Sequence, residues 1–258
     1  RHTQDPYRIW VSEIMLQQTR VAAVIPYYER WMETLPDVAA LAAVEEGALM
    51  KLWEGLGYYS RARNLQKAAQ MIVKDLDGVF PNSREMLLTL PGVGEYTAGA
   101  VASIAFGQRV PAVDGNVLRL AARVADIREN VLDPKVKKDI AAAMEEAVPG
   151  SDPGGYNQAL MDLGATVCLP NGQPLCAQCP LRAFCTKLAI SPRRARSNRT
   201  SFTSSRFLTY RFRAETEITS AIIQPPVRQE WTHRWRCRWN TARARNTPAE
   251  GAAAPRRG

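Results

Sequence analysis

Two carboxylic acids lie in contrasting settings in this 258-residue chain. Glu13 falls in a helical pattern among apolar residues, whereas Asp114 stands where a proline-containing loop leads into the next helix. Burial raises the pKa of a carboxyl, and the N–H groups at a helix start stabilise a negative charge. We therefore predict that Glu13 is a protonated general acid and that Asp114 stays ionised. A buried, ion-paired glutamate and an ordinary N-cap aspartate are the alternatives.

Four of the five cysteines lie close together, at Cys168, Cys176, Cys179 and Cys185. The gaps between them are seven, two and five residues, so the four thiolates can close around one tetrahedral zinc ion or one iron–sulfur cubane. Unligated surface thiols are the alternative. No charged and apolar leader opens the chain, so we expect metal ligation in a reducing compartment in preference to disulfides.

A glycine-containing turn, Pro91-Gly92-Val93-Gly94, lies between two apolar helical patterns in the stretch 90–116. Glycine lets the backbone adopt positive φ and approach another surface closely. The helix that follows the turn offers unpaired N–H groups to a phosphate oxygen. The turn therefore predicts a hairpin that grips a nucleic-acid backbone without reading bases, with Gly92, Val93 and Gly94 at the contact.

Residues 1–187 read as helices throughout, because apolar residues recur at helical spacing and no alternating pattern of useful length appears. Asp-Pro pairs mark three helix starts, since aspartate caps a helix and proline suits its first position. We predict an all-α body with short connections. Two short helices flank the turn, Asp37 caps another, and the longer ones lie at about 6–18, 21–33, 45–54, 61–74, 113–125, 134–148 and 156–167.

The formal charge of +9 is unevenly distributed. Residues 188–258 contain fifteen arginines, no lysine and four glutamates, whereas residues 1–187 carry a net charge of −2. The body must therefore bind a polyanion through local arrangement, and not through bulk charge. We expect the arginine-rich tail to be disordered. No run of eighteen apolar residues occurs, so we expect no membrane span.

Several motifs together resemble the endonuclease III-like superfamily of helix-hairpin-helix DNA glycosylases, and within it the adenine DNA glycosylase (MutY) family. They are WVSEIMLQQTRV, GLGYYSRARNL, LPGVGEYTAGA, VDGNV and YNQALMDLGATVC, and the likeness covers about residues 5–187. It implies an N-terminal helix (1–20) completing the core, a six-helix barrel with the hairpin (21–107) and a cluster domain (108–187). We expect the tail (188–258) to stand where the family has a Nudix-like domain, and a family segment that would precede Arg1 to be missing.

The resemblance implies roles for the acids and two neighbours. Glu13 would protonate adenine, and Asp114 would stabilise an oxocarbenium ion or a covalent sugar adduct. Strand-cutting members carry a lysine where this chain has Tyr96, and a phenol cannot form a Schiff base. Asn116 would orient the water or the carboxylate. The cofactor implied is a [4Fe–4S] cluster on the four cysteines, with zinc as the alternative, although the seven-residue first gap exceeds the family's usual six.

The resemblance also implies how the duplex is held while the adenine leaves the stack. Gln18 and Thr19 belong to a segment that fills the vacated space, Tyr58 wedges beside the mispaired base, and Gln158 lies near the adenine. A solvated helix end and a core aromatic are the alternatives for the first three. Phosphate contacts are expected of three arginines, although charged helix faces are more often only solvated: Arg20, Arg61 and Arg63.

The predicted function is that of a monofunctional base excision repair enzyme that hydrolyses the N-glycosidic bond of adenine opposite 8-oxoguanine or guanine. A catalytically impaired DNA-binding remnant is the alternative, and Tyr96 disfavours a strand-cleaving enzyme. The expected partner is double-stranded DNA with adenine mispairs. We expect the protein to be a monomer and to bind no membrane. The expected location is the bacterial cytoplasm at the nucleoid, or the nucleus or mitochondrion of a eukaryote.

Overall fold

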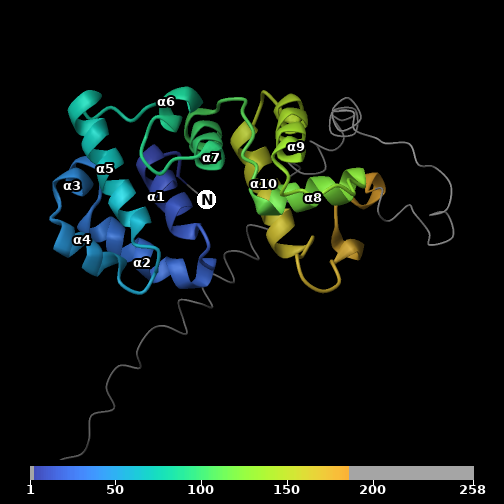
Figure 1. The fold of residues 1–258 in the computed structure, drawn as a ribbon, viewed down its shortest axis with the longest axis horizontal. Coiled ribbons are helices and arrows are strands. Elements are labelled where there is room, and N and C mark those ends of the chain that lie inside the picture. The colour runs from blue at the N-terminus through green and yellow to red at the C-terminus, as the bar shows by residue number, and fades with distance from the viewer. Residues whose placement is uncertain (1–2, 186–258) are drawn as a thin grey trace, which may run out of the picture.

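The computed structural model describes residues 3–185, which form helices and contain no strand (Figure 1). The predicted all-α fold is therefore confirmed for this part of the chain, and the arginine-rich tail lies outside it. Two 3-10 turns, Cys176–Gln178 and Arg182–Phe184, follow ten α-helices in the described residues. These are α1 (Pro6–Leu16), α2 (Val21–Thr34), α3 (Val38–Ala43), α4 (Glu46–Trp53), α5 (Ser60–Asp75), α6 (Arg84–Leu88), α7 (Glu95–Phe106), α8 (Gly115–Ala125), α9 (Pro134–Ala147) and α10 (Pro153–Thr166).

Helix starts follow the capping residues read from the sequence. The side chains of Asp5, Asp133 and Asp152 each accept a hydrogen bond from a backbone N–H of the first turn, and a proline follows each of them. Each such bond satisfies one N–H that has no partner within the helix. Helices α1, α9 and α10 therefore begin where the Asp-Pro pairs predicted, or within three residues of it.

The first hydrophobic core spans residues 7–112 and surrounds α1. Three tryptophans with no exposed surface, Trp10, Trp31 and Trp53, lie in it, and the last two pack edge to face with ring centroids 5.5 Å apart. Helix α1 contacts α2, α5 and α7. Because it is enclosed on several sides, a polar residue placed on α1 is held inside the protein.

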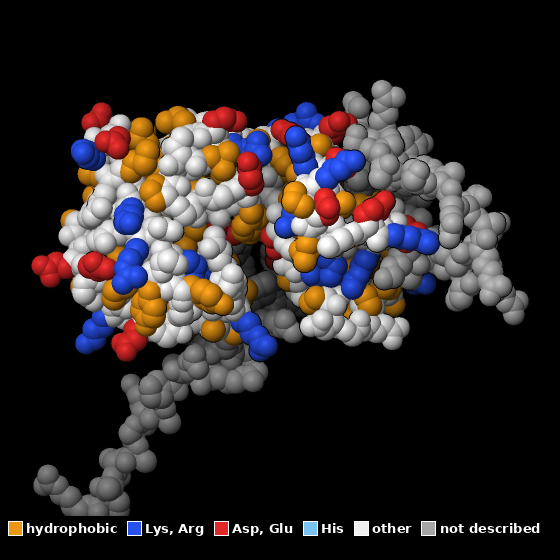
Figure 2. All heavy atoms as spheres, in the orientation of Figure 1, with side chains coloured by type: hydrophobic (Ala, Val, Ile, Leu, Met, Phe, Trp, Pro, Cys, Tyr) orange, Lys and Arg blue, Asp and Glu red, His pale blue; other side chains and the backbone are white. Residues whose placement is uncertain are grey.

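A second hydrophobic core spans residues 117–181 and joins α8, α9 and α10 to the cysteine loop. Helix α10 packs against both α7 and α8 and so connects the two cores. In Figure 1 these C-terminal helices lie to the right of α1–α7, and Figure 2 shows that the surface is hollowed between the two groups. None of the described helices is long and apolar enough to cross a membrane.

Candidate active site

Glu13 lies on the buried side of α1 and is contacted by a tyrosine from α7. Its side chain is 1 % exposed. The Tyr96 hydroxyl donates a hydrogen bond of 2.6 Å to Glu13 Oε2 and lies 3.1 Å from Met161 Sδ. The packing of α1 against α7 brings together these two residues, which are 83 positions apart in the sequence. The apolar setting expected for Glu13 is therefore present, together with a donor that the helical pattern did not predict.

Asp114 is the N-cap of α8. Its Oδ1 accepts from the Val117 N–H at 2.8 Å, and its Oδ2 accepts from Asn116 Nδ2 at 2.7 Å. Burial raises the pKa of Asp114, these hydrogen bonds lower it in part, and the charge of Glu13 raises it further. The helix start does favour the anion, as predicted, but loss of solvation outweighs that effect.

Asn157 of α10 holds the loop that precedes Asp114. Its side chain is 2 % exposed, and its Nδ2 donates to Ser103 Oγ and to the Val110 carbonyl, both at 2.9 Å. Its Oδ1 accepts from the Ala112 N–H at 3.1 Å. One amide therefore fixes the end of α7 and two backbone groups of the loop. Removing it would leave buried polar groups unpaired, which is costly.

Three glycines let this loop and its neighbours pack closely. A Cβ on Gly99 of α7 would collide with the Pro111 carbonyl, and one on Gly164 of α10 would lie 2.6 Å from the Asn116 Cβ. A Cβ on Gly154 would lie 2.8 Å from the backbone of Ile104. Glycine is needed at these positions for close approach, since real Cβ atoms do not come that near.

A chain of hydrogen bonds runs from Asp114 to the first cysteine. Asn116 donates to Asp114 and accepts from Arg119 Nη2 at 2.8 Å. Arg119 Nε donates to the Cys168 carbonyl at 3.0 Å, and its Nη2 donates to the Gly164 carbonyl at 2.8 Å. The predicted role of Asn116 beside the carboxylate fits this position, and Arg119 fixes the orientation of its amide.

The four cysteines lie on the loop after α10, beside α8. Arg123 Nη1 lies 3.2 Å from Cys168 Sγ, and Cys185 Sγ lies 3.5 Å from the Arg123 carbonyl. Burial raises the pKa of Cys179 to about 11, and the other three thiols add to this rise, so the four sulfurs influence one another. Among residues 3–185, no group of three or more His, Cys, Asp or Glu side chains is spaced to hold a metal ion. The donor set fits a soft metal or an iron–sulfur cluster by its chemistry.

The predicted DNA-opening residues lie on two exposed segments. Gln18 and Tyr58 have left-handed backbones, with φ of 57° and 49°, and Tyr58 is 63 % exposed. Gln18 is exposed and Thr19 half-buried. Because α1 ends at Leu16, two residues before the predicted end, Gln18 lies on the turn beyond it. Both segments therefore present side chains outward from strained turns.

Arg61 is too buried to contact a DNA phosphate. It is 9 % exposed, and its guanidinium donates to backbone carbonyls at the end of α1 and before Tyr58. The predicted phosphate contact of Arg61 is therefore wrong, because its donors are used inside the protein. Arg63 is exposed and pairs with Glu46 at 2.9 Å, and Arg20 is exposed at the start of α2.

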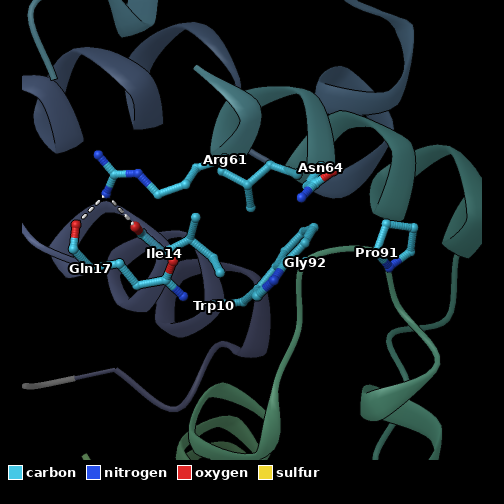
Figure 3. Close-up of a pocket in the computed structure, with 8 residues that line it drawn as sticks. Trp10, Ile14, Gln17, Arg61, Asn64, Pro91 and Gly92 are labelled. Atoms are coloured by element: carbon cyan, nitrogen blue, oxygen red, sulfur yellow. Dashed lines mark hydrogen bonds between the residues drawn. The ribbon is translucent and has the colours of Figure 1, made fainter. Parts of the chain in front are cut away.

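The hairpin turn packs against α5 behind its exposed face. Gly92 has a φ of 77° and a Cβ there would lie 2.7 Å from Asn64, so only glycine fits. Gly92 and Gly94 are exposed, whereas the Val93 side chain is buried and its N–H donates to Leu90. Any contact through Val93 would involve its backbone. A small cavity lies behind the turn, lined by Trp10, Ile14, Gln17, Arg61, Asn64 and Pro91 (Figure 3).

Gln158 is the one predicted pocket residue on α10. It is half-buried, and its Nε2 donates to the Gly154 carbonyl one turn earlier in the same helix, at 3.2 Å. Sequence reasoning missed its neighbour Asn157, although a polar residue among the apolar positions of that helix is a usable signal. Arg119 was also missed, because its role depends on Cys168, 49 positions later.

The fold and the site define a class of protein: a helical protein with a glycine hairpin, a buried glutamate on α1 and a half-buried aspartate that caps α8. The chain belongs to the HhH-GPD superfamily of base excision DNA repair proteins, whose sequence model matches residues 11–149.

Similar proteins agree with this placement. The chain is 49 % identical over 180 residues to the adenine DNA glycosylase of Homo sapiens. The aligned stretch covers 69 % of this chain and 33 % of that protein. The chain is 44 % identical over 184 residues to that of Schizosaccharomyces pombe, covering 70 % and 40 %. The chain thus spans roughly a third to two fifths of the length of these two relatives.

Solved structures share the fold. A thermostable thymine-DNA glycosylase matches with a TM-score of 0.66 at 29 % identity, covering 73 % of this chain and 86 % of that one. A non-covalent endonuclease III–DNA complex matches with a TM-score of 0.62 at 27 % identity, covering 73 % and 88 %.

Proposed function

We propose that the protein is a monofunctional DNA glycosylase that hydrolyses the N-glycosidic bond of adenine mispaired with 8-oxoguanine or guanine. The observation that carries this is the hydrogen bond from Tyr96 of α7 to Glu13, with the half-buried Asp114 following a loop that packs against the same helix at Gly99. The relatives named adenine DNA glycosylase support adenine as the base. The endonuclease III–DNA complex supports duplex DNA as the partner.

Glu13 supplies the proton in this proposal. Because the Tyr96 hydroxyl donates to Oε2, the acid proton belongs on Oε1. Transfer of that proton to the adenine makes the base a better leaving group, and positive charge then grows on the sugar as the bond breaks. The carboxylate of Asp114 stabilises that charge, with Asn116 and the Val117 N–H holding its two oxygens in place. Water then adds to the sugar carbon and gives its proton to the Glu13 carboxylate, which restores the acid.

Tyr96 determines whether the strand stays intact once the base has left. A lysine amine can attack the sugar and form a Schiff base, which leads to strand cleavage, whereas a phenol cannot. The Tyr96 hydroxyl instead contacts Glu13 and Met161. We therefore expect an intact abasic strand as the product.

We further propose that Cys168, Cys176, Cys179 and Cys185 hold a [4Fe–4S] cluster. When bound, the cluster would cross-link the loop after α10. Arg123 would donate to a ligand sulfur, as it does to Cys168 here. Iron and inorganic sulfide in the purified protein would support the cluster, whereas one equivalent of zinc would replace this proposal with a tetrahedral ion.

The test is a glycosylase assay on a duplex with adenine opposite 8-oxoguanine, with and without alkali afterwards. We expect strand breaks only after alkali, and their loss in Glu13→Gln and Asp114→Asn. Glu145→Gln, an exposed glutamate of α9, is the matched control and should keep full activity. Breaks without alkali would indicate a strand-cleaving enzyme, and DNA binding without any product would indicate a remnant. Either result would contradict the proposal.

A further inference from the structure

Arg61 is a buried arginine that joins two separate segments. Its Nη1 lies 2.9, 3.1 and 2.6 Å from the carbonyl oxygens of Ile14, Met15 and Gln17, at the end of α1. Figure 3 shows two of these bonds. Its Nη2 donates to the carbonyls of Leu56 and Gly57 at 3.1 and 3.2 Å, in the turn before α5. One guanidinium therefore bonds to backbone groups more than forty positions apart in the sequence.

Two of the carbonyls that Arg61 binds belong to residues that directly precede a left-handed, strained backbone position. Gln18 and Tyr58 are two of only four non-glycine residues with positive φ among those described. Arg61 binds the carbonyl of the residue just before each of them, Gln17 and Gly57. A left-handed backbone persists at such residues only where surrounding contacts hold it. Charge-assisted hydrogen bonds in a forked geometry are strong enough to do so.

The surroundings of Arg61 suit a fixed cation. The carbonyl-rich end of α1 carries the negative end of the helix dipole. The guanidinium carbon lies 5.2 Å from the Trp53 ring centroid and 5.6 Å from that of Tyr58, so it also contacts the face of the exposed tyrosine. Arg61 thus contacts Tyr58 through both the ring and the preceding carbonyl.

We propose that Arg61 is a positioning residue that holds Gln18 and Tyr58 at a fixed separation, and so sets the shape of a two-part wedge that opens the duplex. This inference rests on the proposed function, in which these two side chains enter the DNA beside the mispair. Arg61 itself touches neither DNA nor the reacting atoms. Its effect is on the step in which adenine leaves the stack, and not on cleavage of the bond.

A purely structural role for Arg61 makes a different prediction. If it only stabilised the end of α1, a substitution would disturb Glu13 and slow excision equally on every substrate. If it sets the wedge, the loss depends on whether the adenine must first be unpaired. Adenine opposite a tetrahydrofuran abasic analogue has no partner base, so excision from that duplex depends less on the wedge.

The test compares Arg61→Lys with Arg128→Lys on both duplexes under single-turnover conditions. Lysine keeps the charge but is a single point donor that cannot bind both segments. We expect Arg61→Lys to lose about tenfold or more in rate opposite 8-oxoguanine and less than about threefold opposite the abasic analogue, since only the first requires opening of a pair. Arg128, which is exposed and paired with Asp126 at 3.0 Å, should tolerate lysine on both. Equal losses on the two duplexes would overturn the proposal.

A second pair of variants covers the case in which Arg61→Lys does not fold. Gly57 and Gly78 have φ of 70° and 76°, and a Cβ at either meets nothing within 4 Å. Alanine therefore strains both turns alike, but only Gly57 offers its carbonyl to Arg61. We expect Gly57→Ala, and not Gly78→Ala, to slow excision selectively on the paired duplex. No selectivity would overturn the proposal.

A readout without turnover separates this inference from the proposed function. In a duplex with 2-aminopurine in place of the adenine, fluorescence rises when the base leaves the stack. A rise with the wild-type protein that Arg61→Lys lacks while still binding supports the wedge, even if no base is ever excised. No rise with the wild type, or an equal rise with both proteins, overturns it. Absence of excision with a wild-type fluorescence rise would contradict the proposed function alone.

Discussion

The Tyr96 hydroxyl contacts one oxygen of the Glu13 carboxyl. Because it donates to Oε2, the carboxyl is oriented before any substrate arrives. In the sequence, Tyr96 was informative mainly because it is not a lysine. In the structure, its hydroxyl also orients Glu13. That role depends on the packing of α7 on α1 and cannot be read from local sequence.

We expect Tyr96→Phe to slow adenine excision about ten- to hundredfold, because Glu13 loses a donor that orients it for proton transfer. The ring stays, so the melting temperature should change by only a few degrees at most. Single-turnover kinetics and thermal unfolding measure the two effects. Tyr28→Phe removes a hydroxyl whose contact with the Arg8 carbonyl is 3.4 Å long, and it serves as the control. An unchanged rate in Tyr96→Phe would contradict the assignment.

The acid side of the pH profile should report Asp114. Burial holds the pKa of Asp114 above the ordinary aspartate value of about 3.9. Only the ionised form stabilises a cation, so excision should slow as the pH falls through that raised pKa, at a pH above about 4. Single-turnover rates between about pH 4 and pH 9 test this, with DNA affinity followed in parallel. A rate that stays constant down to about pH 4 would contradict it.

The raised pKa of Asp114 affects the stability of the fold in the opposite direction. A carboxyl whose pKa is raised in the folded state binds a proton more readily there than in the unfolded chain. The stabilisation it contributes is present below the unfolded pKa and is lost as the pH rises through the folded one. The ionised Asp114 that the proposed reaction requires therefore destabilises the fold at neutral pH.

At the scale of elements, close packing of α7, α8 and α10 positions the Asp114 loop. Gly99 sits against the Pro111 carbonyl, and Asn157 holds the backbone on either side of that residue. These contacts come from three helices that are separated in the sequence. A change at any of them should act on Asp114 from a distance.

We expect Gly99→Ala to lower the free energy of unfolding by about 1–3 kcal/mol, because its methyl group overpacks backbone that cannot move freely. Excision should fall more than stability alone explains, since the displaced loop carries Asp114. Urea denaturation and single-turnover rates measure these effects. Gly47→Ala in α4, where a Cβ meets nothing within 4 Å, should leave activity unchanged and gain up to about 1 kcal/mol. Wild-type activity in a destabilised Gly99→Ala would contradict a positioning role for this contact.

At the scale of the molecule, the helices were predictable because their signals are local. Caps such as Asp5 and Asp152 lie beside the helices they start, and apolar spacing identifies the rest. Contacts across the fold were not predictable in this way. Arg61 was read as a phosphate ligand because charged helix positions are usually exposed, yet it shares helical spacing with the buried Leu65 and Ile72. That spacing is the signal that could have placed it inside.

The candidate site divides along the same line. Glu13 and Asp114 could be picked out from their neighbours in sequence, whereas the Tyr96 hydrogen bond, the Asn157 clamp and the Arg119 link each span 45 or more positions. Such pairs depend on how α1, α7, α8 and α10 meet, and no local pattern encodes that meeting. The domain limits predicted at residues 20, 107 and 187 remain predictions, while the two hydrophobic cores meet between residues 112 and 117.

The order in which the chain is synthesised gives the α10 contacts another consequence. Glu13 and Tyr96 emerge from the ribosome well before Asn157 and Gly164, which hold the Asp114 loop and Asn116. A nascent chain can therefore fold its first core and form the hairpin while its carboxylate is still unplaced. On the proposed function, such a chain could hold DNA through its hairpin, and it could cleave the glycosidic bond once α10 has docked.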